Sequence, residues 1–545
     1  MTSYLYNASG KITQITYPSG RIVNYVRNTL GQVTSVTSKQ NATAAVVNVA
    51  SAMTYAPLSD LLTSITHGNG LVTSAAYDLD YRLTSLGLNN GATPISGLSY
   101  GYGDGINLTA INDNVTPANN IGLSYTAANG LQYAGGSWGS SNYYYDILGN
   151  RTYDNNTVAS VLTSKVTSYD SISNHMTSTY NGATQLRAFA YDGAGNITQD
   201  TRPGSALVFT YNNRNRPSSV TNNALAYATY GYNALDQLTT RSTTAVGGPV
   251  GNVAYIYDLE GHIIAEATAS TGATTRDYIW QAANDNGPVD LPLAVADISG
   301  TTSTVSYVHA DHLGRPTRMT DATKATIWQA AYLPWGEPVT LSGTKANNLR
   351  FPGQYFQIET GLAYNWHRHY DPTTGRYTQP DPLRFVDGPS VYAYAGRSPF
   401  MNTDRMGLDA AGTNQWAQQN ALSGSYGYQD PGSNIGGFLG WLGGRFTLKC
   451  SKFAFDALKG GGNPPNFVNG HIPTVSDWKN GSVLNYSPMP KGSSPMPGDV
   501  VIEGSHMGIF SPPHGPNGSP GTISAASPFH DKRRITVSWQ RRSME

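Results

Sequence analysis

Aromatic and apolar residues alternate with polar residues in a phrase that recurs along residues 1–300. The phrase is an aromatic residue, any residue, Tyr, then Asp or Asn, followed by a turn former and a second apolar–polar alternation. A period of two places successive side chains on opposite faces of a β-strand, so each phrase predicts a strand, a turn and a return strand. The clearest copies are Tyr4–Thr13, Tyr143–Arg151, Phe189–Thr198, Phe209–Arg216, Tyr230–Leu238 and Tyr255–Ile263.

The centre of each phrase has the chemistry of a tight turn. Asp and Asn side chains accept hydrogen bonds from the following backbone, and glycine adopts positive φ without strain. The tyrosines Tyr191, Tyr211 and Tyr232 are separated by 20 and then 21 residues. A single hairpin cannot bury its aromatic row, so neighbouring copies are expected to stack into one continuous sheet. The pattern predicts a mainly β chain without catalytic chemistry in residues 1–300.

The composition restricts the partners of the chain. Charged residues make up only 12% of the 545 residues, and 34 basic side chains balance 34 acidic ones. A chain of zero net charge has no global field that attracts nucleic acid or an anionic membrane. No signal region opens the chain, and no apolar stretch is long enough to span a bilayer. We therefore expect no nucleic-acid partner and no membrane anchor, and the single cysteine, Cys450, excludes an intramolecular disulfide framework.

A second set of motifs follows the repeats. In order, they are Tyr307–Thr317 (YVHADHLGRPT), Pro334–Glu337 (PWGE), Phe351–Tyr355 (FPGQY), Glu359–Asn365 (ETGLAYN) and Tyr370–Leu383 (YDPTTGRYTQPDPL). Together with the tyrosine-aspartate phrase, these motifs resemble the Rhs (rearrangement hot spot) family over about residues 1–408. The resemblance implies a hollow β-sheet shell at residues 1–300, closed by a core region at residues 301–408. It implies a container, not a catalyst, for this part of the chain.

The sequence changes character after Leu408. The repeats stop, loops rich in Pro, Gly and Ser become frequent, and the only cysteine appears. In the Rhs family this junction, here Asn402–Leu408 (NTDRMGL), separates a shared scaffold from a variable C-terminal toxin. The resemblance therefore implies a toxin domain at residues 409–545 that is released by self-cleavage after Leu408.

The resemblance also implies which residues cleave the junction. Two close carboxylates can share one proton, so that one activates water and the other protonates the leaving group. Asp381 and Asp404 match the two motif positions best, and Asp387 is a weaker candidate. Arg376 is expected to hold one carboxylate ionised by a bidentate contact. Without the resemblance, these aspartates would be interpreted as turn residues.

Two departures from the family pattern bear on this cleavage. Arg405 stands where the family has proline, and Leu383–Arg384 stands where it has Leu-Gly. Both replacements are expected to slow or abolish cleavage.

A short helix is predicted around the only cysteine. Thr447 is a suitable N-cap, apolar residues follow at helical spacing, and Gly460 ends the segment. Cys450 then lies in the first turn, where the partial positive charge of the helix N-terminus favours the thiolate. About fifty residues later, Val500–Ile502 and Met507–Phe510 predict a hairpin that carries His506.

A thiol at a helix N-terminus and an imidazole on a strand form the arrangement of a Cys-His hydrolase, with backbone N–H groups as the oxyanion hole. Residues 445–540 resemble the NlpC/P60 and CHAP branch of papain-like peptidases, which implies a small α+β domain that acts on amide bonds, commonly in peptidoglycan. Cys450 would be the nucleophile and His506 the base. Ser524 stands where the orienting residue is expected, with His514 and His530 as alternatives.

Three interpretations remain open. The first is a secreted antibacterial effector, a shell that carries a cysteine hydrolase aimed at peptidoglycan in the periplasm. The second keeps the chemistry but directs it at a cytosolic target protein. The third is a non-enzymatic repeat protein of the cell surface. The first two imply a cognate immunity protein, and a secretion-apparatus component or a missing N-terminal delivery domain. No cofactor or metal is expected, because His367-x-His369 lacks a third ligand at suitable spacing.

Overall fold

The computed structural model describes residues 2–103, 107–158, 161–244, 251–284, 289–385 and 388–408, and the backbone of five strands between residues 486 and 541. The chain divides into two compact units. The first comprises Met1–Ala56, Asp60–Pro382 and Pro389–Leu408, and the second comprises Pro57–Ser59, Leu383–Gly388 and Asp409–Glu545. Within the described ranges, no helix has both the length and the apolar character needed to cross a membrane.

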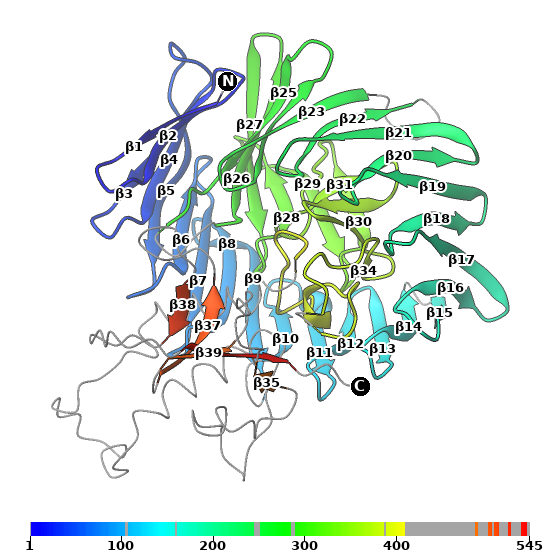
Figure 1. Ribbon diagram of the computed structural model, residues 1–545. Helices are drawn as coiled ribbons and strands as arrows, with labels where there is room; N and C mark the ends of the chain where they lie inside the picture. The colour runs from blue at the N-terminus through cyan, green and yellow to red at the C-terminus, as the bar shows by residue number, and fades with distance from the viewer. Residues whose placement is uncertain are drawn as a thin grey trace, which may run out of the picture. The chain divides into compact units, whose positions relative to one another are not determined.

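The first unit is built on one 30-stranded sheet, in which each strand pairs antiparallel with the next along the chain (Figure 1). The mainly β fold predicted from the repeats is therefore confirmed. The first fifteen strands are β1 (Ser3–Tyr6), β2 (Ile12–Thr16), β3 (Ile22–Arg27), β4 (Val33–Lys39), β5 (Val47–Tyr55), β6 (Leu62–His67), β7 (Val72–Tyr77), β8 (Leu83–Asn90), β9 (Thr93–Tyr102), β10 (Leu108–Asp113), β11 (Ile121–Tyr125), β12 (Leu131–Gly136), β13 (Gly139–Tyr145), β14 (Arg151–Val158) and β15 (Val161–Tyr169).

The sheet continues without a crossover to residue 343. Its remaining strands are β16 (Met176–Asn181), β17 (Thr184–Tyr191), β18 (Ile197–Arg202), β19 (Ser205–Tyr211), β20 (Pro217–Asn222), β21 (Leu225–Tyr232), β22 (Leu238–Thr243), β23 (Gly251–Tyr257), β24 (Ile263–Thr268), β25 (Thr274–Trp280), β26 (Pro292–Ser299), β27 (Thr302–Ala310), β28 (Pro316–Thr320), β29 (Thr326–Tyr332) and β30 (Pro338–Gly343). Short 3₁₀ helices occur at Pro117–Asn119 and Ala395–Arg397.

The turns of the repeats have the predicted chemistry. Asp146 Oδ1 accepts hydrogen bonds from the backbone N–H groups of Leu148 and Asn150, at 2.9 and 2.8 Å. Gly149 in this turn has φ of +78°. Where the repeat lacks glycine, Asn215 and Asp236 take the same left-handed conformation, with φ of +59° and +61°. Asn and Asp tolerate this region better than other side chains do, which is why the repeat survives these replacements.

The repeat tyrosine connects each hairpin to the one before it. The hydroxyl group of Tyr211 donates to the carbonyl oxygen of Ile197 at 2.6 Å, and that of Tyr257 donates to Leu238 at 2.7 Å. The same contact recurs in the hydroxyl groups of Tyr55, Tyr77, Tyr102, Tyr145, Tyr169 and Tyr191. The pairing register shifts at each of these tyrosines, for example between Thr210 and Tyr211. The tyrosine therefore satisfies a carbonyl group where the strand pairing is irregular.

The first strands of the sheet also contact strands far along the chain. The hydroxyl group of Tyr17 donates to the carbonyl oxygen of Tyr278 at 3.0 Å. Arg21 forms an ion pair with Asp277 at 2.8 Å, and both side chains are almost fully buried. The largest hydrophobic core accordingly combines residues of β2–β6 with residues of β19–β29.

A second, four-stranded sheet of the first unit is formed by β31 (Tyr355–Gln357), β32 (Leu362–Asn365), β33 (Arg368–Asp371) and β34 (Arg376–Tyr377). Buried polar contacts join it to the large sheet. Glu359 accepts from Arg241 at 3.0 Å, and Asp371 pairs with Arg187 at 2.6 Å. These contacts fix the position of β33, which carries the central residue of the candidate site.

A third sheet lies in the second unit and contains β35 (Tyr486–Pro488), β36 (Val500–Glu503), β37 (His506–Ser511), β38 (Gly521–Ser524) and β39 (Thr536–Arg541). β36 and β37 form the predicted hairpin, with Glu503 opposite His506.

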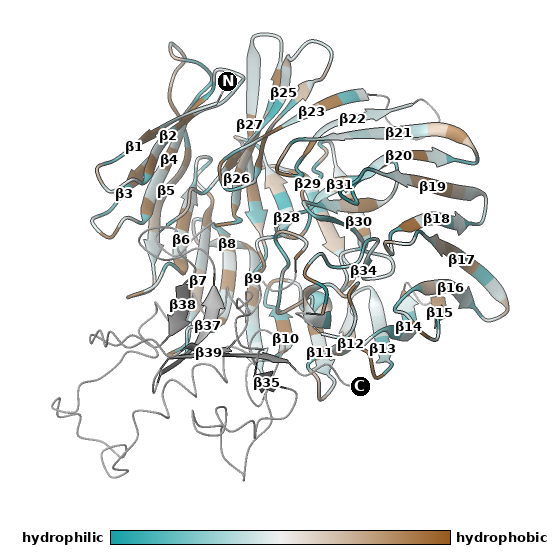
Figure 2. Cartoon of the chain, in the orientation of Figure 1, coloured by the Kyte–Doolittle hydropathy of each residue, from teal (hydrophilic) through white to brown (hydrophobic). Residues whose placement is uncertain are grey.

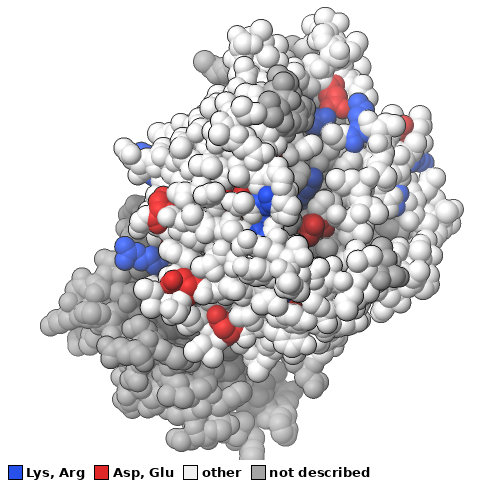
Figure 3. Space-filling view, turned by 90° about the vertical axis from the view of Figure 1, so that its right-hand side faces the viewer, with Lys and Arg blue, Asp and Glu red and all other residues white. Residues whose placement is uncertain are grey.

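The surface agrees with the composition. Hydrophobic and hydrophilic residues are interspersed along the strands of the large sheet (Figure 2). The face in Figure 3 shows only scattered charged side chains among uncharged ones. Many of the charged residues are instead buried in pairs, such as Arg21 with Asp277 and Arg368 with Asp404. Buried charges require such partners, and they mark the places where the structure is most specific.

Candidate functional site

Asp381 and Asp404, the two aspartates predicted to cleave the junction, meet at one buried arginine. Nη2 of Arg368, on β33, lies 2.9 Å from Oδ2 of Asp381 and 3.0 Å from Oδ2 of Asp404. The exposed fractions are 1% for Arg368, 6% for Asp381 and 0% for Asp404. Because both oxygens contact the same nitrogen, they lie within about 6 Å of each other. The geometry brings together the two carboxylates that sequence reasoning selected.

The carboxylate of Asp404 also contacts the end of the junction. The hydroxyl group of Tyr377 donates a hydrogen bond to Oδ2 at 2.6 Å, and the backbone N–H of Leu408 donates one to Oδ1 at 2.9 Å. The guanidinium of Arg368 stacks over the Tyr377 ring, 3.6 Å from its centroid. Asp404 is thus held from three sides and reaches the residue after which cleavage is expected.

Hydrogen bonds from β32, β33 and the turn between them hold the backbone of residues 404–408. Asn365 Nδ2 donates to the carbonyl oxygen of Asp404 at 2.7 Å, and Arg368 Nε donates to that of Gly407 at 2.6 Å. The backbone N–H of His367 donates to Met406 at 3.1 Å. A Cβ atom at Gly407 would collide with the carbonyl oxygen of Asn365. The glycine at this position is therefore required by close packing.

Arg376, which was expected to hold one carboxylate, contacts two turns of the large sheet, and its role at a carboxylate stays a prediction. Its Nη1 donates to Oδ1 of Asn150 at 2.9 Å, and its Nη2 donates to the carbonyl oxygen of Asn174 at 2.8 Å. Arg376 thereby connects the small sheet to the large one, and Arg368 holds the two carboxylates. Asp387 lies outside the described residues. Arg384 has φ of +64°, a conformation that favours the glycine of the family pattern.

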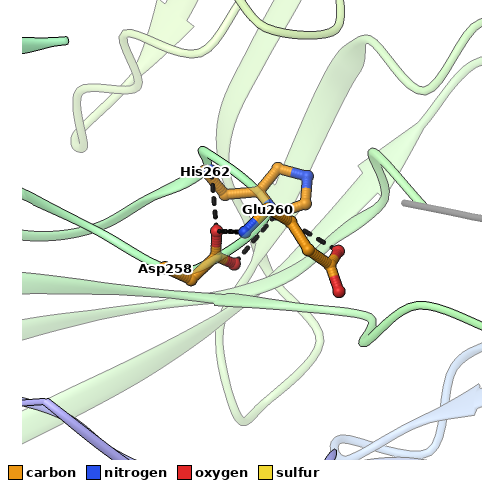
Figure 4. Close-up of side chains that lie close together, drawn as sticks. All are labelled: Asp258, Glu260 and His262. Carbon is orange, nitrogen blue, oxygen red and sulfur yellow. Dashed lines mark hydrogen bonds and ion pairs between the residues drawn. The ribbon is translucent and has the colours of Figure 1, made fainter. Parts of the chain in front are cut away.

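A second polar cluster borders the junction. Asp258, Glu260 and His262 lie in the turn between β23 and β24, with one ligand atom of each within 4.8 Å of the others (Figure 4). His262 Nδ1 is 3.0 Å from Asp258, and Nε2 is 2.8 Å from Asp290. Burial opposes the charge on His262, but the two carboxylates outweigh it and raise its pKa to about 9. Because both ring nitrogens of His262 contact carboxylates, we describe this cluster as an ionic network.

The shell histidines have structural surroundings. His367 Nδ1 lies 2.9 Å from Nη2 of Arg216, so it accepts a hydrogen bond from a guanidinium. Burial, reinforced by Arg216, lowers the pKa of His367 to about 4, and burial lowers that of His369 to about 3. His309 and His312 are bound through Nε2 to neutral oxygen atoms at 2.9 Å. All four lie in the core region at residues 301–408.

The predicted hydrolase residues lie partly beyond the described structure. Cys450, His514 and His530 are outside the described residues. His506 begins β37, and Ser524 ends β38 opposite Gly508, two residues further along β37. His506 and Ser524 therefore occupy neighbouring strands near one end of the third sheet. Their roles stay predictions.

Two family models match the chain. The model "RHS Repeat" matches residues 6–43, which include β2–β4, and the model "RHS protein" matches residues 305–340, which include the motif at Tyr307–Thr317. The chain is therefore similar to Rhs sequences in two segments, one at each end of the large sheet.

The chain is also similar to proteins named as toxins. It is 38% identical to "Toxin protein Tse5" of Pseudomonas aeruginosa over 19% of this chain and 8% of that protein. It is 27% identical to "Double-stranded DNA deaminase toxin A" of Burkholderia cenocepacia over 39% of this chain and 18% of that protein. It is 27% identical to "tRNA nuclease WapA" of Bacillus subtilis over 48% of this chain and 10% of that protein. The chain spans less than a fifth of these relatives.

Solved structures share the fold. The crystal structure of TcdB2-TccC3 matches 75% of this chain and 22% of that chain, with a TM-score of 0.62 and 17% identity. The pore structure of the Photorhabdus luminescens Tc holotoxin matches 75% of this chain and 21% of that chain, with a TM-score of 0.61 and 16% identity. The chain is therefore similar to Rhs sequences in two segments, and it shares the fold of these solved structures.

Proposed function

We propose that this chain belongs to an Rhs-type antibacterial toxin. Residues 1–408 form the shell, and self-cleavage after Leu408 releases residues 409–545 as an enzyme. The toxin role is supported by the relatives, which include proteins named as a deaminase and as tRNA nucleases. A cognate immunity protein and a delivery component are the partners that this role requires.

One observation carries the self-cleavage: Asp381 and Asp404 share Nη2 of Arg368, and Asp404 accepts from the N–H of Leu408. In the proposed step, one carboxylate removes a proton from water, and the water oxygen bonds to the carbonyl carbon of Leu408. The peptide bond to Asp409 breaks, and its nitrogen takes a proton from the other carboxyl group. Arg368 balances the negative charge of the pair while the proton moves.

Mass spectrometry of the denatured full chain tests this step. We expect two species, residues 1–408 and 409–545. Asp381→Asn and Asp404→Asn should each give one intact chain, because an amide cannot accept the proton. Asp80→Asn is the matched control, since Asp80 has a side-chain exposed fraction of 78%. A wild-type chain that stays intact at every accessible pH refutes the proposal.

For the released segment, we propose a cysteine hydrolase with Cys450 as nucleophile, His506 as base and Ser524 as orienting residue. The pairing of β36 with β37 and of β37 with β38 supports it, because it places His506 and Ser524 on neighbouring strands. The proposed substrates are peptide amides of peptidoglycan. A cytosolic target protein is the second candidate, and two relatives named for DNA and tRNA favour a target inside the cell.

Expression of residues 409–545 in a bacterial host separates these candidates. Killing only after export to the periplasm supports peptidoglycan, and cytosolic killing supports the second candidate. Cys450→Ala and His506→Ala should each abolish killing, because nucleophile and base act as one unit. Ser524→Ala should reduce killing less than these two substitutions do. Killing that survives Cys450→Ala rules out the cysteine hydrolase.

A further inference from the structure

The residue after Asp404 contacts a different part of the molecule. Arg405 Nε lies 2.5 Å from Oδ1 of Asp290, and its Nη2 donates to the carbonyl oxygen of Glu260 and lies 3.3 Å from Nε2 of His262. The side chain of Arg405 has an exposed fraction of 18%. A largely buried guanidinium with a carboxylate partner and a carbonyl partner is held by charge as well as by shape.

Asp258, His262 and Asp290 together form what we call the arginine receptor. Asp258 and Asp290 flank the His262 ring, which also stacks on Trp280 at 4.5 Å between centroids. Two carboxylates and one imidazolium leave one net negative charge, and the carboxylate of Glu260 lies 3.8 Å from Nδ1 of His262, so the guanidinium of Arg405 faces a negatively charged cluster. Burial alone would raise the pKa of Asp290, but Arg405 and His262 outweigh burial and lower it to about 2.

The backbone of Arg405 is fixed from the other side. A Cβ atom at Gly353 would collide with the carbonyl oxygen of Arg405. Gly353 has φ of +80°, so glycine is favoured there twice, by conformation and by contact. The main chain and the side chain of Arg405 are therefore both held, one residue away from the buried carboxylate of Asp404.

We propose that the arginine receptor recognises Arg405 and thereby positions residues 404–408 for self-cleavage. Arg405 is then a positioning residue, and the junction is specific for a basic side chain next to Asp404. This inference rests on the proposed self-cleavage after Leu408.

The chemistry of the receptor accounts for this specificity. Proline, the family residue at this position, has no group that reaches Asp290. An acidic side chain would be repelled by the carboxylates of Asp258 and Asp290. Lysine supplies the positive charge, but its ammonium group is compact. It cannot contact both Asp290 and the carbonyl group of Glu260 as the planar guanidinium of Arg405 does. The departure at Arg405 is thus matched by partners elsewhere in the chain.

Time courses of cleavage in the full chain test the proposal. Arg405→Ala should slow cleavage by about tenfold or more, because charge-assisted hydrogen bonds are lost. Arg405→Lys should be intermediate. Ethylguanidinium at a low, non-denaturing concentration should restore part of the rate of Arg405→Ala, whereas tetramethylammonium at equal ionic strength should not. Arg82→Ala is the control, because it removes an arginine paired with Asp78 at 2.7 Å near the surface.

Hydrogen exchange of the backbone N–H groups of residues 406–408 in the uncleaved Asp381→Asn chain provides an independent readout. Adding Arg405→Ala should raise exchange there by about tenfold or more, and adding Arg82→Ala should not. A rate and an exchange pattern that Arg405→Ala leaves unchanged overturn the inference, as does equal rescue by both cations. A wild-type chain that never cleaves, with faster exchange in the Arg405→Ala chain, overturns the self-cleavage but supports the anchoring role of Arg405.

Discussion

Oδ1 of Asp404 accepts a hydrogen bond from the backbone N–H of Leu408 at 2.9 Å, so a fully buried carboxylate lies against the residue at the end of the junction. The other oxygen of the same carboxylate contacts Arg368, which also binds Asp381. The proposed acid, base and cleaved bond are therefore connected through one arginine. This connection leads to the first prediction.

Replacing Arg368 should cost both stability and cleavage. Arg368→Gln leaves two buried carboxylates without their cation, and breaking a buried ion pair in this way costs about 3–5 kcal/mol. We expect a lower free energy of unfolding in urea and loss of the two cleavage fragments. Arg376→Gln is the control, because it removes hydrogen bonds to Asn150 and Asn174 and leaves the carboxylates paired. Cleavage of Arg368→Gln at the wild-type rate would contradict the role given to Arg368.

The charge of His262 should make stability depend on pH. Its folded pKa of about 9 exceeds the ordinary value of 6.5, because Asp258 and Asp290 outweigh burial. The stabilisation is therefore fully present below pH 6.5 and is lost as the pH rises through about 9. Its size is up to about 3 kcal/mol. Glu260 and Arg405 also face this group, so the wild type should be compared with His262→Gln by urea unfolding at several pH values. Parallel curves for the two chains would count against the prediction.

The repeat tyrosines should stabilise the sheet through their hydroxyl groups. Tyr211→Phe removes the hydrogen bond to the carbonyl oxygen of Ile197, at a cost of about 1–3 kcal/mol for an acceptor left unpaired. Tyr144 has an exposed fraction of 51%, so Tyr144→Phe is the matched control. The urea midpoint should fall for Tyr211→Phe and stay near the wild-type value for Tyr144→Phe. Equal midpoints for the two variants would mean that the hydroxyl contact adds nothing.

Gly353 and Gly20 provide a comparison of two glycines with similar backbones. Their φ angles are +80° and +87°, so alanine carries a similar conformational cost of about 1 kcal/mol at both. A Cβ atom at Gly20 meets nothing within 4 Å, but one at Gly353 meets the carbonyl oxygen of Arg405. We expect Gly353→Ala to slow cleavage and to destabilise the chain more than Gly20→Ala does. If both variants cleave equally fast, the contact does not position the junction.

The local parts of the fold were predictable, because their causes lie within one repeat. The Asx turn at Asp146 and the positive φ of Gly149 follow from adjacent residues. The partner of Asp404 did not follow in the same way. Arg368, on β33, lies 36 residues before Asp404 in the sequence. Arg376, by contrast, lies within the motif Tyr370–Leu383 that also contains Asp381. Which of the two buried arginines contacts Asp404 depends on how β33 and β34 pack, and no local pattern encodes that packing.

The arginine receptor could not be predicted from the sequence for the same reason. Asp258 and His262 belong to a repeat turn, and their spacing is explained by that turn alone. Only the folded chain brings them to Arg405, 145 residues beyond Glu260. A departure from a family pattern is therefore best judged together with the residues that surround it in space.

The contacts of Tyr17 and Arg21 with Tyr278 and Asp277 have a consequence for synthesis of the chain. Their partners are about 260 residues later in the sequence. The early hairpins emerge from the ribosome long before β25 is synthesised. Part of the apolar surface of β2–β4 therefore stays exposed to solvent until then. The contact between the early and late strands of the large sheet therefore forms late, and a chain truncated before residue 277 should be a substrate for chaperones and proteases.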